Sequence, residues 1–197
     1  VFTNCKEEVK KQDYTLKGGV FGTSYKITYL NGTKNYQKSL DSLFLKINNS
    51  VSTYIPNSII SRINKGETGI VVDYIFEEVF NKSKRIYKET DGFFDPTVGN
   101  LVNAYGFGPK KEKRNLSEEE IQSYMQFVGL NKVILKKDKI IKEHSNVYLD
   151  FNSIAKGLSI DIVARFFDTK NIKSYLIEIG GEIRAKGKKA NGKPWLI

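Results

Sequence analysis

The sequence is poor in the residues on which several common kinds of site depend. It contains one cysteine, Cys5, and one histidine, His144, among 197 residues. A single cysteine excludes a disulfide within the chain, and one cysteine with one distant histidine excludes a Cys/His zinc cluster. A Ser–His–Asp triad would have to use His144, which stands beside a predicted turn and which we interpret as a surface residue.

Long apolar runs and phosphate-binding glycine motifs are absent as well. No apolar run is long enough to span a bilayer. Neither a Walker A motif nor a GxGxxG motif occurs, which excludes the two commonest nucleotide fingerprints. The hydrophobic content of 40% and the aromatic content of 12% indicate a folded globular protein. Its length allows one sizeable core or two small lobes.

Positive charge is present in excess, with a formal net charge of +10. Such an excess is found in proteins that bind nucleic acids or phosphate-bearing ligands, but it also describes a lysine-rich surface. The lysines are scattered, and the dense group at 110–114 is interrupted by Glu112. We therefore favour the basic surface and expect no nucleic-acid partner.

The amino-terminal residues read VFTNCKEE and are followed by a charged stretch. This pattern resembles the end of a lipoprotein signal peptide, in which Cys5 carries the lipid. We predict that residues 1–16 are a signal-peptide remnant and a tether to the membrane, and that 17–197 form the domain. The protein would then be an exported, membrane-anchored lipoprotein on the periplasmic side of a bacterial cell. The alternative is an unstructured start with an incidental cysteine.

Periodicity predicts an α+β fold with a mixed, largely antiparallel sheet and packed helices. Helices are expected over 36–52, 71–90, 117–127 and 153–168. The stretch 52–64 is expected to break the first of them at Pro56. Strands are expected over 20–29, 132–135, 139–141, 147–151, 172–179 and 182–186. Turns are expected at Asn31-Gly32, and between the strands of a meander over 132–151. The apolar end at 194–197 suggests that the sequence stops in the middle of a fold.

The stretch 90–108, TDGFFDPTVGNLVNAYGFG, combines two acids, an adjacent pair of rings and four glycines. We interpret it as a loop that presents backbone amides, carboxylates and ring faces to a ligand. The alternative is a set of ordinary Asp-Gly and Asp-Pro turns. Asp91 fits a structural turn after a helix, whereas Asp95 is the candidate ligand.

Two further stretches are candidates for binding phosphate. In 148–161, a strand is expected to end at Asp150 and a helix to begin near Ser153, with Lys156 in its first turn. A helix amino terminus with a nearby lysine suits a phosphate group, although the same residues could be a plain helix cap with Lys156 in solvent. In IGGE, 179–182, paired glycines allow a ligand to approach the backbone, or they form a bulge.

Together these segments resemble the FAD:protein FMN transferase family, the ApbE flavin transferases. The matching blocks are Phe21-Gly22-Thr23, STY at 52–54, SRIN at 61–64, the stretch 90–108, LDFNSIAKG at 149–157 and IGGEIRAKG at 179–187. The resemblance implies an ApbE-like fold, here incomplete at the carboxyl end. It also implies transfer of FMN from FAD to a threonine or serine hydroxyl of a target protein, with release of AMP and dependence on a divalent metal, usually magnesium.

The resemblance also implies roles for individual residues. The FAD-contacting positions are Phe21, Tyr54, Phe93, Phe94, Asp95, Asp150 and Lys156. Ser153 falls at a metal position, through its backbone carbonyl. Phe21 departs from the family, which usually has methionine there.

The family's carboxyl-terminal part is missing from this sequence. It carries a histidine-containing HxxDPxTG-like segment and the acidic and threonine metal ligands. The catalytic residues are expected there, so the chain as given is expected to be inactive. Three other functions remain open: an FAD-binding module without catalysis, an FAD-hydrolysing homologue, and an exported interaction domain.

Overall fold

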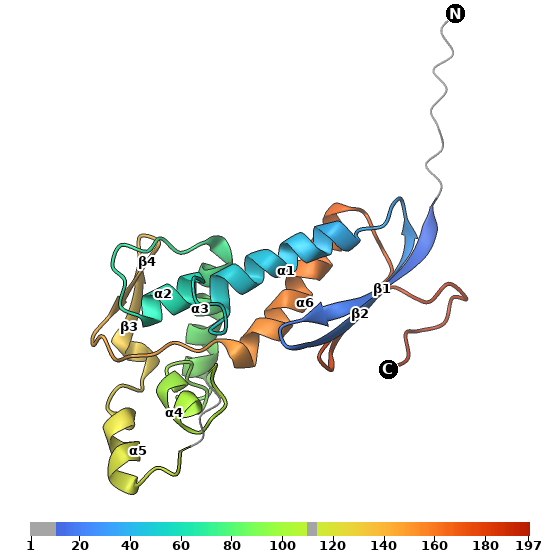
Figure 1. Cartoon of the computed structure of the whole chain (residues 1–197). Helices are drawn as coiled ribbons and strands as arrows, with labels where there is room; N and C mark the ends of the chain where they lie inside the picture. Colours follow the sequence, from blue (N-terminus) through green and yellow to red (C-terminus); the bar gives the residue numbers. More distant parts are fainter. Residues whose placement is uncertain (1–10, 110–113) are drawn as a thin grey trace, which may run out of the picture. The chain divides into compact units, whose positions relative to one another are not determined.

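Figure 1 shows the computed structural model, which describes residues 11–109 and 114–197. The chain divides into two compact units. The sheet unit consists of the residues up to Phe44 together with Lys156–Ile197, and the helical unit consists of Leu45–Ala155. The boundaries fall within two helices, α1 (Gln37–Val51) and α6 (Asn152–Thr169), which were both predicted.

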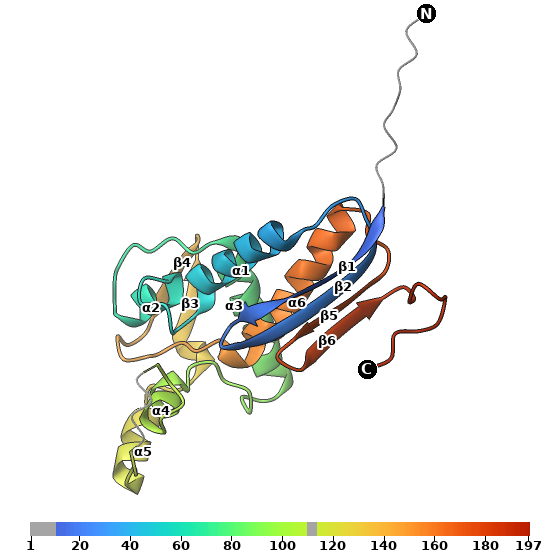
Figure 2. The ribbon, with the colours of Figure 1, turned by 45° about the vertical axis from the view of Figure 1, so that its right-hand side comes forward.

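The sheet unit is built on four strands in the order β1-β2-β5-β6. They are β1 (Gln12–Val20), β2 (Thr23–Gly32), β5 (Tyr175–Ile179) and β6 (Glu182–Lys186). Every pairing is antiparallel, which confirms the predicted largely antiparallel sheet. In Figure 2 the four strands lie side by side, and the carboxyl-terminal half of α6 runs along them.

Aromatic rings form much of the core of this unit. The Tyr29 and Phe167 ring centroids lie 4.9 Å apart, and those of Phe167 and Tyr175 lie 5.5 Å apart. All three side chains are fully buried. The Tyr29 hydroxyl donates to the carbonyl of Lys34 at 3.0 Å and accepts the amide of Tyr36 at 3.0 Å. Burial raises the pKa of Tyr29 to about 12, so the hydroxyl stays neutral and can keep both bonds.

Short helices and one hairpin make up the helical unit. They are α2 (Ile59–Asn64), α3 (Tyr74–Glu89), α4 (Gly99–Ala104), α5 (Glu118–Met125), a 3₁₀ turn at Leu130–Lys132, β3 (Val133–Lys136) and β4 (Lys139–Lys142). The predicted capping box begins α5: the Ser117 hydroxyl accepts the Glu120 amide and the Glu120 carboxylate accepts the Ser117 amide. The apolar stripe predicted α3 and the capping box predicted α5, each to within a few residues.

The predicted third strand of the meander, 147–151, is wrong. Val147, Leu149 and Phe151 alternate with their neighbours and are fully buried, so the period-two pattern is real. Among the described residues, however, the segment makes only one isolated backbone bridge, between Tyr148 and Val98, and joins no sheet. The Asn64 side chain bonds the carbonyl and the amide of Leu149 at 2.8 and 2.9 Å. The Asn64 side chain thus bonds backbone groups of Leu149 that a neighbouring strand would otherwise bond. The alternation of the sequence does not show which partner a segment has.

Other differences concern where elements begin and end. The stretch 90–108 is not all loop, because it contains α4. Helix α1 ends at Val51, ahead of the predicted break at Pro56. Strand β2 continues through Asn31 and Gly32, which therefore do not form the predicted turn. Strand β1 begins at Gln12, inside the segment 1–16 that was expected to be a tether.

In the part of the chain that the structure describes, no helix has the length and apolar character needed to cross a membrane. Cys5, the predicted lipid-bearing residue, lies outside the described residues. The same holds for three of the lysines and arginines of the basic group at 110–114, of which only Arg114 is described.

Candidate functional site

Phe21 stands in a tight hairpin turn of the sheet unit. Val20 pairs with Thr23 across the turn, and the two residues between them, Phe21 and Gly22, have φ angles of 52° and 73°. Two left-handed residues are the mark of a type I′ turn, which matches the twist of the strands it joins. Left-handed backbone is uncommon for a bulky side chain. The Phe21 ring packs edge-on against Phe44 at 5.7 Å, which fixes its direction.

A second turn of the same kind lies at the same end of the sheet. Gly180 and Gly181, with φ angles of 58° and 86°, connect Ile179 to Glu182. The Gly180 amide donates to the carbonyl of Ser24 at 3.0 Å, next to the start of β2. The register of β5 with β6 is continuous, so the interpretation of these glycines as a bulge is wrong. They form a turn.

Lys156 lies beside this second turn. A Cβ atom added to Gly180 would come within 3.4 Å of Cδ of Lys156 and within 2.8 Å of Cγ2 of Thr23. Lys156 is the fifth residue of α6 rather than part of its first turn. Its Nζ lies 3.2 Å from Oε1 of Glu182, so it does not simply point into solvent. The sheet unit thus gathers Lys156 and the two turns at one end of the sheet.

In the helical unit, the loop after α3 is anchored by its own backbone and presents Phe93 to solvent. The amide of Gly92 donates to the carbonyl of Tyr87 at 2.8 Å, and Asp91 has a φ of 49°, as expected for a structural turn after a helix. The amide of Phe94 donates to the hydroxyl of Thr90 at 3.1 Å. Phe93 is 97% exposed. A ring that is held out by a fixed loop is available to a ligand.

Asp95 is engaged within the protein. Its Oδ1 accepts the amide of Thr97 at 2.8 Å and the hydroxyl of Thr97 at 2.6 Å. The Thr97 hydroxyl accepts in turn the amide of Gly129 at 2.7 Å. Asp95 therefore has a structural role in tying this loop down, and its predicted contact with FAD stays a prediction.

Asp150 lies next to the same loop. Its amide donates to the carbonyl of Pro96 at 2.7 Å, and Tyr148 forms an isolated bridge with Val98. Oδ1 of Asp150 accepts the amide of Asn152 at the start of α6 at 2.7 Å. Burial raises the pKa of Asp150, against the opposing effect of its bonds to Asn152. The structure thus brings together two segments that sequence reasoning treated as parts of one site.

Tyr54 and Phe107 are two further exposed aromatic residues in the helical unit, and they contact each other. The Tyr54 hydroxyl donates to the carbonyl of Phe107 at 2.9 Å, and Phe107 itself is 76% exposed. A Cβ on Gly108 would stand 1.7 Å from Oδ1 of Asn103, so a larger residue here would need the Asn103 side chain to move. Sequence reasoning missed Phe107 as a candidate. The signal that could have found it is an aromatic residue placed between two turn glycines.

Ser153 is exposed in the first turn of α6. Within this sequence, its carbonyl is the oxygen that the resemblance assigns to a metal. Among the described residues, no group of three or more histidine, cysteine, aspartate or glutamate side chains comes together as a metal site. These residues therefore do not build a complete magnesium site by themselves.

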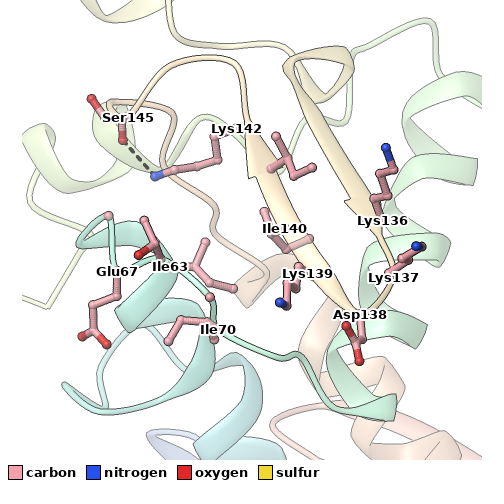
Figure 3. Close-up of a pocket in the computed structure, with 14 residues that line it drawn as sticks. Ile63, Glu67, Ile70, Lys136, Lys137, Asp138, Lys139, Ile140, Lys142 and Ser145 are labelled. Carbon is pink, nitrogen blue, oxygen red and sulfur yellow. Dashed lines mark hydrogen bonds between the residues drawn. The ribbon is translucent and has the colours of Figure 1, made fainter.

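A separate hollow of about 730 Å³ lies in the helical unit, between the loop after α2 and the β3–β4 hairpin. Figure 3 shows Ile63, Glu67 and Ile70 on one side and the strand residues on the other. The Lys142 amine donates to the carbonyls of Ser145 and Val147 at 2.8 and 2.9 Å. None of the predicted site residues lines this hollow.

Comparison with known proteins decides which family this chain represents. Residues 21–197 match the ApbE family. The chain belongs to the ApbE family. This confirms the resemblance found in the motifs and the expected ApbE-like fold.

Relatives of the chain are named FAD:protein FMN transferase. The one from Haemophilus influenzae is 35% identical over 207 aligned positions, which cover 98% of this chain and 59% of that protein. The one from Vibrio cholerae is 33% identical and covers 92% of this chain and 57% of that protein. This ApbE-family chain therefore spans less than two thirds of the length of these relatives.

Solved ApbE structures have the same fold. The flavin transferase ApbE from Vibrio cholerae superposes with a TM-score of 0.88 at 32% identity, over 95% of this chain and 63% of that one. The apo form of the Pseudomonas stutzeri flavinyl transferase ApbE also gives a TM-score of 0.88, at 28% identity.

Proposed function

We propose that the full-length protein transfers FMN from FAD to a threonine or serine hydroxyl of a target protein. The observation that carries this proposal is the match to the ApbE family over residues 21–197, together with relatives named FAD:protein FMN transferase at up to 35% identity. The named relatives are enzymes that use FAD and act on a protein, and the proposal extends both properties to this chain.

In the proposed reaction, the hydroxyl oxygen of the acceptor attacks the phosphorus on the FMN side of the FAD pyrophosphate. A phosphoester bond forms, the bond from that phosphorus to the bridging oxygen breaks, and AMP leaves with the bridging oxygen. The hydroxyl proton is lost to a base. Phosphoryl transfer depends mainly on positioning and on charge near the phosphate oxygens, so the enzyme does not need a covalent nucleophile of its own.

Three residues are proposed to bind FAD in different ways. Lys156 supplies a positive charge to the phosphates, because an ammonium group acts as a point charge that suits them. The exposed ring of Phe93 stacks on a flavin or adenine ring. Asp150 accepts a hydrogen bond from a ribose hydroxyl or a base edge with an oxygen of its carboxylate. Partial exposure of the Lys156 side chain, at 35%, supports its access to a ligand.

The reaction is proposed to require a divalent cation such as magnesium, which would place positive charge on the phosphate oxygens. Ser153 would contribute its carbonyl oxygen, since magnesium takes oxygen ligands and retains several waters. Since no group of three or more histidine, cysteine, aspartate or glutamate side chains among the described residues forms a metal site, further ligands would have to complete it.

The experiment incubates full-length protein with FAD, magnesium chloride and a threonine-containing acceptor peptide. AMP is measured by chromatography and covalent flavin on the peptide by mass spectrometry. AMP together with a flavinylated peptide supports the transferase. AMP with free FMN identifies an FAD hydrolase, and bound FAD without products identifies a binding module. If FAD does not bind at all, the proposal fails and an interaction domain remains.

We also propose that the protein is exported and anchored to the periplasmic side of a bacterial membrane by lipid on Cys5. The support is the sequence VFTNCKEE. Radiolabelled palmitate should be incorporated into the wild-type protein expressed in a bacterium and not into Cys5→Ser. Equal labelling of both proteins, or none of either, would contradict the anchor.

A further inference from the structure

Ion pairs connect helix α6 to strand β6 along the sheet unit. The pairs are Lys156 with Glu182, Asp161 with Arg184, and Asp168 with Lys186. Residues 182, 184 and 186 are spaced two apart on β6, so their side chains share one face of the strand. The pairs therefore form a row between two elements, and their members can be compared with one another.

The first pair in the row has the opposite polarity to the other two. Asp161 and Asp168 place the acid on the helix and the cation on the strand, whereas Lys156 places the cation on the helix. Lys156 also lies near the amino end of α6, where the helix dipole favours negative charge. A pair that only stabilised the fold would be expected to place the acid on the helix and the cation on the strand. The reversed order points to a use for a positive charge at this end of the helix.

Two glycines, Gly157 and Gly180, lie next to the side chains of this pair. A Cβ on Gly157 would stand 3.2 Å from Oε2 of Glu182, and a Cβ on Gly180 would stand 3.4 Å from Cδ of Lys156. The carboxylate of Glu182 thus lies against bare helix backbone, and the stem of Lys156 lies against a bare turn. Both charged side chains therefore lie close to glycine backbone.

We propose that Glu182 is a positioning residue that holds the Lys156 ammonium group for the phosphates of FAD. This inference rests on the proposed function. An ammonium group has three N–H donors, so Lys156 can keep its bond to Glu182 and offer the remaining donors to phosphate oxygens. A flexible lysine loses rotamer freedom when it binds, and Glu182 imposes that restriction before the ligand arrives.

The test compares Glu182→Gln with wild type in the full-length protein, using two ligands. FAD carries the pyrophosphate, and riboflavin has the same ring system without phosphate. We expect the dissociation constant for FAD to rise about tenfold, which corresponds to about 1.4 kcal/mol of lost binding free energy. The dissociation constant for riboflavin should not change. Lys186→Gln, which breaks a similarly exposed pair on the same strand, should change neither.

A second variant tests whether Glu182 acts through Lys156. In a Lys156→Met background, Glu182→Gln should weaken FAD binding no further, because the group that it positions is gone. Additive losses, equal weakening of riboflavin, or tighter FAD binding by Glu182→Gln would each overturn the inference. A wild-type protein that does not bind FAD would instead show that the proposed function itself is wrong.

Discussion

Rings of the same chemical type have opposite environments in the two units. In the sheet unit, Tyr29, Phe167 and Tyr175 are fully buried and contact one another. In the helical unit, Phe93 and Phe107 project from loops that hydrogen bonds hold in place. Burial of a ring stabilises the fold through the apolar area removed from water. A ring that is held in solvent contributes little to stability, and we predict that Phe93 contacts a ligand instead.

The largest expected effect is on the buried side of this comparison. Phe167→Ala should lower the free energy of unfolding by about 3–5 kcal/mol, because it removes a ring from a packed core and leaves a cavity. Denaturant unfolding followed by circular dichroism measures this change. Phe93→Ala is the matched control and should change stability by less than about 0.5 kcal/mol. Similar losses in the two variants would remove the distinction between the two sets of rings.

The next effect is on the exposed side. Phe93→Ala should weaken FAD binding about tenfold or more, since stacking a base on an aromatic side chain contributes about 1–3 kcal/mol. Quenching of flavin fluorescence in the full-length protein measures the affinity. Ile134→Ala, at an exposed apolar residue of the β3–β4 hairpin, should leave it unchanged. Wild-type affinity in Phe93→Ala would show that this ring is merely an exposed apolar residue.

Tyr54 allows a finer test, because substitutions can separate the contribution of its ring from that of its hydroxyl. Tyr54→Phe loses the bond to the carbonyl of Phe107 and keeps the ring. We expect a loss of at most about 1 kcal/mol of stability, the usual net value of one hydrogen bond. FAD affinity should fall less than in Tyr54→Ala. If Tyr54→Phe and Tyr54→Ala weaken FAD binding equally, the hydroxyl and not the ring makes the contact.

How far the sequence predicts this fold depends on whether the signal is local. The capping box at Ser117 and the apolar stripe of α3 are local patterns, and both were predicted. The strand expected over 147–151 is wrong because the segment is held by the Asn64 side chain and by one isolated bridge to Val98, both far away in the sequence. The turn at Phe21 was missed because Phe-Gly is a rare pair of residues for two left-handed positions.

For the candidate site, the sequence identified segments but not the contacts between them. The segments around Asp95 and Asp150 were both identified, and the structure places them in contact through Pro96. The pairing of Lys156 with Glu182 was not predicted. Both residues belong to motifs that were identified, but only the register of β5 with β6 brings Glu182 to the helix.

Asp150 is expected to affect both the stability of the fold and the binding of a ligand. Its effect on stability is expected to be the smallest of those predicted. Its folded-state pKa is raised above the ordinary value of 3.8 by burial. The folded protein therefore binds this proton more tightly than the unfolded chain does, and stability falls as the pH rises from 3.8 through the higher folded value. Above the folded-state pKa the ionised carboxylate lowers the stability of the fold, which is explained if its oxygens serve a ligand.

Asp150→Asn should remove this dependence, because an amide does not titrate and its oxygen can still accept the Asn152 amide. We expect the variant to unfold at neutral pH with a free energy equal to or greater than that of wild type, and to bind FAD less tightly. Denaturant unfolding at several pH values, with FAD titration at neutral pH, measures both quantities. A variant that is less stable at neutral pH would mean that the ionised carboxylate supports the fold, and unchanged FAD affinity would remove Asp150 from the site.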